Sequence, residues 1–458
     1  MSQRWSAQGL IDLVLDDRSF ESWDDPVDIS GHPESYQQEL RTAAQRAGTD
    51  ESVLTGRGLV RGRPVAVVVN EFAFLGGSIG QAAGGRIVAA VRRATAEGLP
   101  LVATTASGGT RMQEGTPAFV EMVAISRAVM DHRAAGLPYL VHLRHPTTGG
   151  VYASWGSLGH VTVAEPGALV GFLGPKVFEA LEGHRFPEGV QRAENLAEKG
   201  VIDAVVSTED LPALLDKTLA VLVDPPEPAA LPLRDASGGT RLPVWESVEL
   251  TRSAERLGVR HLLRYGTHGT LALNGTEEGE QDAAVLVTLT RLDGQPCVLV
   301  GQDRLRQTRT TPLGAAALRE ARRGMRLAEE LDLPLVTVID TPGAELSVAA
   351  EEGAIAGEIA RCIATLTTMT VPTISVILGQ GCGGGALALL PAQVVIATQN
   401  AWLSPLRPRG RASSASATWT MPRRWPSRRA SAPPRSCGPA SCTAWSPSSP
   451  RTAPSPSP

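Results

Sequence analysis

Short apolar runs alternate with helical patterns along most of the chain. Residues 8–50 begin with apolar residues at helical spacing and are predicted to be helical. The next part contains three runs that are apolar on both faces and rich in β-branched residues, at 63–70, 99–105 and 137–143. Runs of this kind, separated by helical stretches, are typical of buried parallel strands in βα units. The pattern therefore predicts an α/β fold.

A stripe of apolar residues lies between the second and third runs. Its members recur at helical spacing, which predicts a helix with one face packed in the core. The stripe consists of Phe119, Met122, Val123, Val129 and Met130.

The pattern of the first half returns in the second half. Residues 222–245 are rich in Pro and Gly, break the periodicity and are predicted to be a linker. Beyond this linker, LPLVATTASGGTRMQEG at 99–115 returns as LPLVTVIDTPGAELSVAAEEG at 333–353, an offset of 234 residues between Pro100 and Pro334. The chain is therefore predicted to contain two copies of one βα fold.

Composition places the chain among globular proteins. It has 458 residues, of which 42% are apolar and 20% charged, with a formal net charge of -4. No apolar run approaches the roughly 18 residues of a membrane span, and Asp16 and Asp17 interrupt the N-terminal apolar stretch. The five cysteines are scattered without a CxxC pair. We therefore expect a cytoplasmic protein with reduced thiols, no disulfide framework and no membrane association.

The last 52 residues differ in composition from the rest. Residues 407–458 contain 9 Arg, 12 Ser and 11 Pro but no Lys, Asp or Glu. Such a segment has too little apolar surface to offset the entropy lost on ordering. It is predicted to be a disordered tail.

Four glycine-bearing loops follow predicted strands. Glycine lets a ligand approach the backbone, and unpaired N–H groups at the start of a helix can hold an oxyanion. The simpler interpretation of each loop is a tight turn that needs a positive φ. None fits a phosphate-binding P-loop or a dinucleotide fingerprint. The loops are FAFLGGSIG (72–80), SGGTRMQEG (107–115), PTTGGVYASWG (146–156) and GQGCGGGALAL (379–389).

The histidines do not predict a metal site. His142, His145 and His160 share one segment but lack the spacing of ligands on one helix face. His132 and His184 are predicted to be surface residues.

Two candidate nucleophiles are also weak. Cys382 lies in the last glycine loop, but no histidine is near it in the sequence to activate the thiol. Ser107 precedes Gly108 outside any GxSxG context and is predicted to be a helix cap.

The glycine motifs and their flanks carry a family resemblance. On FAFLGGSIG, SGGTRMQEG, PTTGGVYASWGSLGHVTVAEPGALVGFLGP and FPEGVQRAENLAEKGVIDAVV, the first copy resembles the β subunit of bacterial acetyl-CoA carboxylase carboxyltransferase. On LAEELDLPLVTVIDTPGAE, EEGAIAGEIAR and GQGCGGGALALL, the second copy is similar to its α subunit. The resemblance covers residues 1 to about 406. It implies a fused β–α carboxyltransferase with two tandem crotonase-like (ClpP/crotonase) domains of ββα-superhelix units.

The resemblance also implies a division into domains. Residues 1–221 would form the β-like domain on the acyl-CoA side, and residues 246–406 a truncated α-like domain on the biotin side. Residues 222–245 would be the linker, followed at 407–458 by the basic Ser/Pro/Arg tail.

The activity implied is a step of fatty acid biosynthesis. The enzyme would move a carboxyl group from carboxybiotin, held on biotin carboxyl carrier protein, to acetyl-CoA to form malonyl-CoA. Biotin carboxylase would be a further partner, and a homo-oligomer is expected. The groups required are biotin on its carrier and a CoA thioester as substrate, with no metal and no nucleic acid.

This reaction develops two oxyanions, and each needs preorganised N–H donors. By resemblance, Gly149 and Gly150 would hold the acyl thioester oxygen, and Gly384 and Gly385 the biotin carbonyl. The internal repeat instead aligns Gly150 with Gly384, so the position of the second pair is defined only to within one residue. The remaining binding residues expected are Gly76, Gly77, Ser107, Gly108, Gly109 and Gly383.

Two departures from the family stand out. The family's β subunit begins with a four-cysteine zinc ribbon, whereas no cysteine precedes Cys297 here, so a zinc role is not carried over. The α subunit continues after SPL with PPEG, whereas this chain reads SPLRPRGRASSAS. The abrupt change predicts a frameshift near Leu406. The alternative is a genuine basic tail that binds nucleic acid, with Trp419, Trp425 and Trp445 stacking on bases.

Other functions stay open on the sequence alone. The chain could be a carboxyltransferase for propionyl-CoA or a broader range of acyl-CoA thioesters. It could be another crotonase-fold CoA enzyme, such as a hydratase or decarboxylase, or an inactive truncated relic. A hydratase needs carboxylates as acid and base. Glu114 is the one candidate, and it is better predicted as a first-turn helix carboxylate.

Overall fold

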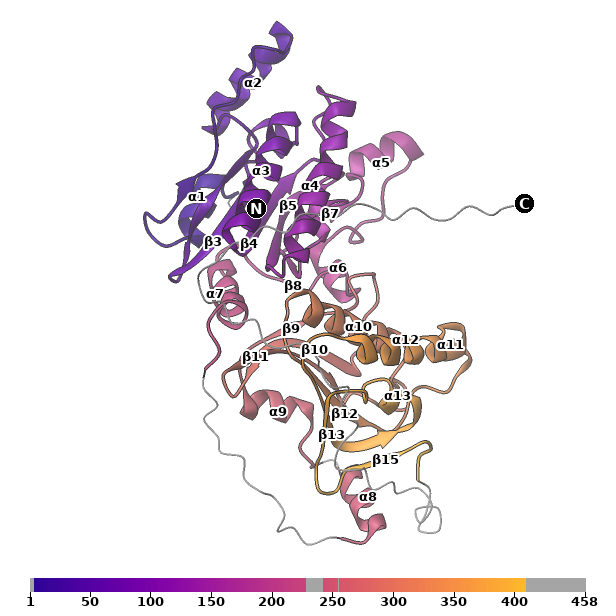
Figure 1. Cartoon of the computed structure of the whole chain (residues 1–458). Helices are drawn as coiled ribbons and strands as arrows, with labels where there is room; N and C mark the ends of the chain where they lie inside the picture. The colour runs from indigo at the N-terminus through magenta and orange to yellow at the C-terminus, as the bar shows by residue number, and fades with distance from the viewer. Residues whose placement is uncertain (1–3, 228–241, 254, 409–458) are drawn as a thin grey trace, which may run out of the picture.

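The first half of the chain forms one twisted sheet flanked by helices (Figure 1). The structure is a computed structural model that describes residues 4–227, 242–253 and 255–408. The strands of the first sheet are β1 (Glu21–Ser22), β2 (Val53–Val60), β3 (Arg63–Asn70), β4 (Leu101–Ser107), β5 (Tyr139–Thr148), β6 (Val161–Ala164), β7 (Val170–Gly171) and β8 (Ala204–Val205). Their order is β1-β2-β3-β4-β5-β6-β8, with β7 paired to β5, and all neighbours from β3 onward are parallel.

The second half repeats this sheet. Its strands are β9 (Thr267–Leu273), β10 (Val285–Leu292), β11 (Gln295–Gln302), β12 (Leu335–Thr341), β13 (Thr373–Cys382), β14 (Val394–Ala397) and β15 (Trp402–Ser404). The order is β14-β13-β12-β11-β10-β9, with β15 paired to β13. Strands β11 to β14 are parallel, as β3 to β6 are. The predicted pair of tandem crotonase-like α/β domains is therefore confirmed as two sheets of matching topology.

The helices follow the same repeat, with α3 and α10 after the first parallel strand of each half and α4 and α12 after the second. The helices of the first half are α1 (Ala7–Val14), α2 (Glu34–Ala47), α3 (Gln81–Glu97), α4 (Thr116–Ala134), α5 (Pro175–Glu182), α6 (Ala193–Glu198) and α7 (Leu211–Leu222), with 3-10 turns η1 (Leu75–Gly77) and η2 (Trp155–Ser157). Those of the second are α8 (Val244–Arg252), α9 (Val259–Gly266), α10 (Ala315–Glu330), α11 (Val348–Glu352), α12 (Ile355–Thr368) and α13 (Gly383–Leu387).

The β2–β3 hairpin and the β10–β11 hairpin turn in the same way. Between β2 and β3, Arg61 and Gly62 have φ of 49° and 80°, and between β10 and β11, Asp293 and Gly294 have φ of 46° and 77°. Two consecutive positive φ values define the turn whose twist matches paired strands. The repeat is therefore preserved down to the turn type.

The two halves share one hydrophobic core. Helix α7 contacts β2 in the first sheet and β9 and β10 in the second, and it lies between the sheets in Figure 1. A continuous apolar cluster joins Val102 and Leu140 of the first sheet, Leu215 of α7, and Val287 and Leu318 of the second half. The halves consequently pack as one body around α7 and α10.

Several sequence predictions need correction. Residues 8–50 are not continuously helical, because α1 and α2 are separated by β1 and its flanking loops. Of the predicted core stripe on α4, Met122 and Val129 are buried, but Phe119, Val123 and Met130 are exposed. The helical period was right, but only part of this face meets another element of the chain.

One histidine prediction is wrong. His132 is fully buried rather than on the surface, with its Nδ1 3.0 Å from Thr95 Oγ1 and its Nε2 3.3 Å from the Pro138 carbonyl oxygen. His184 is exposed, as predicted.

The predicted linker and tail lie largely beyond what the structure describes. Helix α7 ends at Leu222 and α8 begins at Val244, so residues 244–245 of the predicted linker are helical. The predicted disorder of 407–458 falls, except for two residues, outside the described residues. Within the described ranges, no helix combines the length and the apolar character needed to cross a membrane.

Candidate active site

Three glycine loops of the first half meet where β3, β4 and β5 end. The Gly108 N–H donates to the Gly76 carbonyl oxygen at 2.9 Å, which joins the loops after β3 and β4. Gly109 and Gly149 touch, since a Cβ added to Gly109 would lie 3.3 Å from the Gly149 Cα. Both have positive φ, 105° and 64°. Parallel strands end at one edge of a sheet, so loops distant in sequence become neighbours there.

Most N–H groups of these glycines already have acceptors. Those of Gly77, Gly108 and Gly149 donate to the carbonyl oxygens of Phe74, Gly76 and Phe172, each at 2.9 Å. The Gly109 N–H donates to Ser107 Oγ at 3.0 Å. In the described part of the chain, the Gly150 N–H makes no hydrogen bond. Of the predicted pair, Gly150 is thus the donor left for a ligand, and Gly149 supplies the positive φ.

The roles of Ser107 and Glu114 differ from their predictions. Ser107 is not a helix cap, because it ends β4 and its Oγ accepts from Gly109 nine residues before α4 begins at Thr116. Glu114 precedes that first turn, and its Oε2 accepts from the N–H of Gln81, the first residue of α3, at 2.6 Å. Ser107 therefore shapes the loop, and Glu114 caps the neighbouring helix.

The environment of Glu114 does not suit a general acid. Burial raises its pKa, but the Gln81 N–H, the Tyr36 hydroxyl at 2.7 Å and the Arg111 guanidinium outweigh burial, and the net pKa is lowered. A carboxylate held ionised cannot donate a proton at neutral pH. The hydratase alternative loses its one candidate residue.

Arg111 ties two of the loops together, a role that the sequence did not reveal. Its side chain is fully buried and pairs with both carboxylate oxygens of Glu51. It also donates to the Ser78 carbonyl oxygen at 2.8 Å and lies over the Phe74 ring. Arginine within SGGTRMQEG was visible, but its partners are 33 and 60 residues away. Local patterns contain no signal for such distant contacts.

The second half contains an equivalent loop pair. The Gly343 N–H donates to Thr341 Oγ1 at 3.1 Å, as Gly109 does to Ser107. In the strand register, Ser107 pairs with Thr147 and Thr341 pairs with Gly381. Counting forward two and three residues makes Gly149 equivalent to Gly383 and Gly150 to Gly384. The repeat thus favours Gly383 and Gly384, one residue before the predicted pair of Gly384 and Gly385.

Gly385 is placed by a buried side chain. Its carbonyl oxygen accepts from Gln302 Nε2 at 2.7 Å, and Gln302 Oε1 accepts from the Asp340 N–H at 3.0 Å. The Gln302 amide therefore connects the end of β12 to the start of α13. Cys382, just before these glycines, is buried, and burial raises the pKa of its thiol. A protonated thiol is a poor nucleophile, as expected for a packing role.

The histidines of the first half are dispersed among structural contacts. His145 Nδ1 accepts from the Leu169 N–H, and His160 Nδ1 from the Tyr139 N–H, both at 3.0 Å. His142 is enclosed in the core, and burial lowers its pKa to about 3. Over the described ranges, no group of three or more His, Cys, Asp or Glu side chains is arranged to hold a metal ion.

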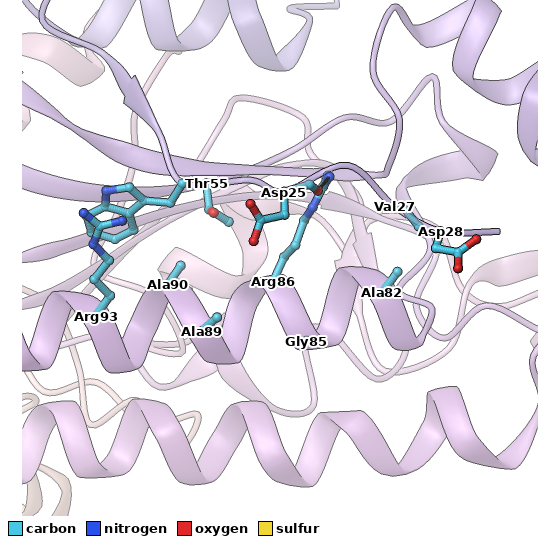
Figure 2. A pocket seen from close by; sticks show the side chains of 11 residues that line it. Asp25, Val27, Asp28, Thr55, Ala82, Gly85, Arg86, Ala89, Ala90 and Arg93 are labelled. Carbon is cyan, nitrogen blue, oxygen red and sulfur yellow. Dashed lines mark hydrogen bonds between the residues drawn. The ribbon is translucent and has the colours of Figure 1, made fainter. Parts of the chain in front are cut away.

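A pocket of about 510 Å³ lies along α3, but the three loops do not line it (Figure 2). Arg86 and Arg93 project from α3 toward the segment that carries Trp23 and Asp25. Arg86 pairs with Asp50 at 2.7 Å, and Arg93 stacks on Trp23 and pairs with Glu97. The arginines of this pocket are thus neutralised by carboxylates of the protein. The glycine loops remain the candidate site.

Comparison with known proteins defines the class. The family described as carboxyl transferase domain matches residues 9–418, and the chain belongs to this family. A Mycobacterium tuberculosis protein, "Probable biotin-dependent acyl-coenzyme A carboxylase beta3 subunit", is 57% identical over 397 residues, covering 87% of this chain and 80% of that protein. The Salinispora arenicola "Acetyl-coenzyme A carboxylase carboxyl transferase subunits beta/alpha" is 37% identical over 429 residues, covering 89% and 76%.

Solved structures share the fold. The crystal structure of the transcarboxylase 12S hexamer superposes with a TM-score of 0.71 at 22% identity, covering 88% of this chain and 76% of that one. A single-chain, multi-domain long-chain acyl-CoA carboxylase gives 0.67 over 85% of this chain and 38% of that one. Both comparisons show that this chain shares its two-sheet fold with these structures.

Proposed function

We propose that the chain is the carboxyltransferase component of a biotin-dependent acyl-CoA carboxylase. It would transfer the carboxyl group of carboxybiotin, presented by biotin carboxyl carrier protein, to an acyl-CoA thioester. Biotin carboxylase would regenerate carboxybiotin on that carrier. The observation that carries the proposal is the duplicated glycine site, one per half, in a chain of the carboxyl transferase family.

The chemistry explains why two sites are needed. Carboxybiotin, when bound, would supply both the CO₂ and the base for the α-proton of the thioester. Negative charge develops on the thioester oxygen and on the biotin carbonyl oxygen, and fixed N–H donors stabilise each. Gly150 offers its free N–H to the first oxygen, and the glycines at 383–385 offer theirs to the second.

Acetyl-CoA is the acceptor that we propose, with malonyl-CoA as product. The motifs shared with acetyl-CoA carboxylase subunits support it. The 57% identical relative is named for acyl-CoA rather than acetyl-CoA, which favours a broader set of acceptors as the second candidate. One added methylene changes the preference of an apolar pocket by only about 10- to 200-fold. A direct comparison of the rates with acetyl-CoA and with longer acyl-CoA thioesters therefore distinguishes the two candidates.

The test supplies the purified protein with carboxylated biotin carrier protein and one acyl-CoA at a time. We expect malonyl-CoA from acetyl-CoA, at a higher kcat/KM than methylmalonyl-CoA from propionyl-CoA, both quantified by mass spectrometry. If propionyl-CoA is used equally well or faster, the assignment changes from acetyl-CoA to the broader class of acyl-CoA acceptors. Absence of carboxylated product with either thioester, also from a chain with the in-frame residues after 406, would refute the function.

We also propose that a second copy of the chain covers an apolar surface of the first half. Exposed apolar side chains follow α4 and the segment around α5: Met112, Phe119, Val120, Val123, Phe172, Val177 and Leu181. Phe119 and Val123 are 63% and 69% exposed. Apolar patches of this kind mark protein contacts. The surface borders the candidate site, because Met122 of α4 packs on Gly150 and the Phe172 carbonyl accepts from Gly149.

A further inference from the structure

A fully buried carboxylate, that of Asp340, lies near the end of β12 and close to the second glycine site. The Asp340 N–H donates to Gln302 Oε1 at 3.0 Å, and its carbonyl oxygen accepts from Gln307 Nε2 at 3.1 Å. Its Oδ1 accepts from the Gln380 N–H at 3.1 Å. The Arg256 Nη2 group donates to both carboxylate oxygens, at 2.7 and 2.6 Å. Asp340 therefore connects the ends of β11, β12 and β13.

Arg256 reaches this carboxylate from outside the sheet, because it lies between α8 and α9. Its side chain is 17% exposed, and its Nη1 also donates to the Leu378 carbonyl oxygen of β13 at 3.1 Å. The guanidinium lies against the backbone of Gly379, where an added Cβ would overlap it. A second guanidinium, that of Arg304, stays 3.8 Å from Asp340 Oδ2. Arg256 is therefore the cation that ties the carboxylate to β13.

Two contacts lead from Asp340 to the glycine donors. On one side, Gln380 lies on β13, three residues before Gly383 begins α13 with a φ of 60°. On the other side, Gln302 Nε2 donates to the Gly385 carbonyl oxygen at 2.7 Å, in the first turn of α13. The first N–H groups of a helix have no partner within that helix, so their direction depends on what holds the turn. Here partners of Asp340 hold the turn from both sides.

The first half has an uncharged residue at the position of Asp340. Leu101 of β4 pairs with Ala66 of β3 as Leu335 of β12 pairs with Val298 of β11. Counting five residues forward from each leucine makes Ala106 the equivalent of Asp340. Removing the ion pair should therefore disturb the second glycine site and leave the first as an internal reference.

We infer that the Arg256–Asp340 ion pair fixes the second glycine site in its donor geometry. The pair holds the end of β13 through Gln380, and Gln302 passes the position of Asp340 on to Gly385. Arg256 and Gln302 are thus positioning residues, because they act on the donors and not on the reacting atoms. The inference rests on the proposed carboxyltransferase function and adds the residues that orient the N–H groups offered to the biotin carbonyl oxygen.

Amide hydrogen exchange of the full chain tests the positioning without turnover. The probes are the amides at 388–390, which donate to carbonyl oxygens of α13, and those at 153–154, which donate to carbonyl oxygens of the first glycine loop. We expect Arg256→Met to speed exchange at 388–390 at least about 10-fold, the effect of losing a hydrogen bond to a charged group, and to leave 153–154 unchanged.

The matched control is Arg264→Met, at an exposed position of α9, which should exchange as the parent does. Exchange at the parent rate at 388–390 in Arg256→Met, or an equal gain at both glycine sites, would overturn the inference. Should Arg256→Met fail to fold, Arg256→Lys takes its place with the same expected direction, because lysine keeps the cation but loses the planar fork that reaches both Asp340 and Leu378.

Gln302→Met tests the second contact with the ion pair intact. Methionine is of similar length but cannot donate to the Gly385 carbonyl oxygen, so we again expect faster exchange at 388–390 and no change at 153–154. Gln295→Met, exposed at the other end of β11, is the matched control and should exchange as the parent does. Exchange at the parent rate in Gln302→Met would show that Gln302 does not position the glycines.

Transfer kinetics separate positioning from a general loss of stability. We expect Arg256→Met and Gln302→Met to lower kcat about 10- to 100-fold per CoA-binding chain while the KM for acetyl-CoA stays unchanged, because misplaced donors affect the chemical step. An unchanged kcat per CoA-binding chain would overturn the inference. If the parent transfers no carboxyl group but both variants still speed exchange at 388–390 alone, the positioning is supported and only the proposed function is refuted.

Discussion

Gly150 combines a free backbone N–H with an α-carbon that has little room for a side chain. A Cβ there would lie 3.1 Å from both Met122 Cγ and Thr110 Oγ1. Gly150→Val therefore displaces the loop from its donor position, and we expect kcat to fall about 100-fold or more, the usual effect of losing one oxyanion donor. Steady-state kinetics with acetyl-CoA measure this, and the binding of CoA should change much less.

Gly85 is the matched control for this substitution. It lies in α3, and nothing is within 4 Å of an added Cβ. Gly85→Ala should leave kcat unchanged and stabilise the fold by about 0.5–1 kcal/mol, because alanine is the better helix former. A Gly150→Val enzyme that folds normally and keeps its turnover would show that the Gly150 N–H has no catalytic role.

His142 makes stability depend on pH. Its ring is fully enclosed, and burial lowers the pKa to about 3 from the ordinary 6.5. Between these values the unfolded chain binds a proton that the folded chain does not, so the free energy of unfolding decreases as pH falls from about 6.5 toward 3.

His142→Leu should remove this dependence. Between pH 7.5 and pH 5, we expect the free energy of unfolding to fall by about 2 kcal/mol less in the variant than in the parent. The figure follows because pH 5 is about 1.5 units below the ordinary pKa and each unit corresponds to about 1.4 kcal/mol. Urea denaturation at both pH values measures the difference. His132, whose pKa burial lowers to about 4, keeps part of the acid sensitivity. Identical pH profiles would mean that His142 titrates normally.

At the scale of elements, helix α10 joins the two halves through a buried ion pair. Arg323 of α10 contacts both carboxylate oxygens of Asp203, at 2.8 and 3.1 Å, next to β8 of the first half. Asp203 also accepts from the N–H groups of Thr162 and Asn274. The network explains why the halves pack as one body despite their separate sheets.

Breaking this pair should destabilise the whole chain. Arg323→Ala leaves the Asp203 carboxylate buried without its cation, and we expect a loss of about 3–5 kcal/mol in the free energy of unfolding. Arg326→Ala, on the same helix but paired with Glu277 near the surface, should cost less than about 1 kcal/mol. Chemical denaturation followed by fluorescence distinguishes them. Equal small losses would show that the halves unfold independently.

At the scale of the whole molecule, the exposed face of α4 predicts self-association. Phe119→Glu places a charge in the apolar surface. We expect it to raise the concentration at which half of the oligomer dissociates at least about 10-fold, the effect of roughly 1.4 kcal/mol. Analytical ultracentrifugation over a concentration series measures it. Arg127→Glu, on the same helix at an exposed position paired with Asp131, is the control. A parent chain that is monomeric at all concentrations would refute the proposal.

In the first sheet, β8 covers the outer edge of β6, whereas no described strand covers the outer edge of the equivalent β14 in the second sheet. Strand β6 pairs with both β5 and β8, whereas β14 pairs only with β13 among the described strands, and Val394 and Ile396 are each 51% exposed. The frameshift near Leu406 stays a prediction, and this edge offers a way to test it. Replacing residues 407–458 by the in-frame continuation should raise the Tm and the turnover, because it covers this edge. Deleting them should do neither, and equal stability of all three chains would favour a genuine basic tail.

The sequence by itself determined the repeat, the parallel strands and the glycine loops. These depend on local signals: buried β-branched runs predicted β3, β4 and β5, and the 234-residue offset predicted two copies of one fold. Loops after parallel strands must lie at one edge of a sheet, which is why most of the candidate site could be predicted.

Only the tertiary structure decided which atoms of that site are available. Whether a glycine N–H is free depends on acceptors elsewhere, as the pairing of Gly149 with Phe172 shows. The role of Arg111 depends on Glu51, and the exposure of Phe119 on what packs against α4, so neither could be read locally. Periodicity defines the faces of an element, but contacts between distant segments determine which face is buried and which polar groups remain free.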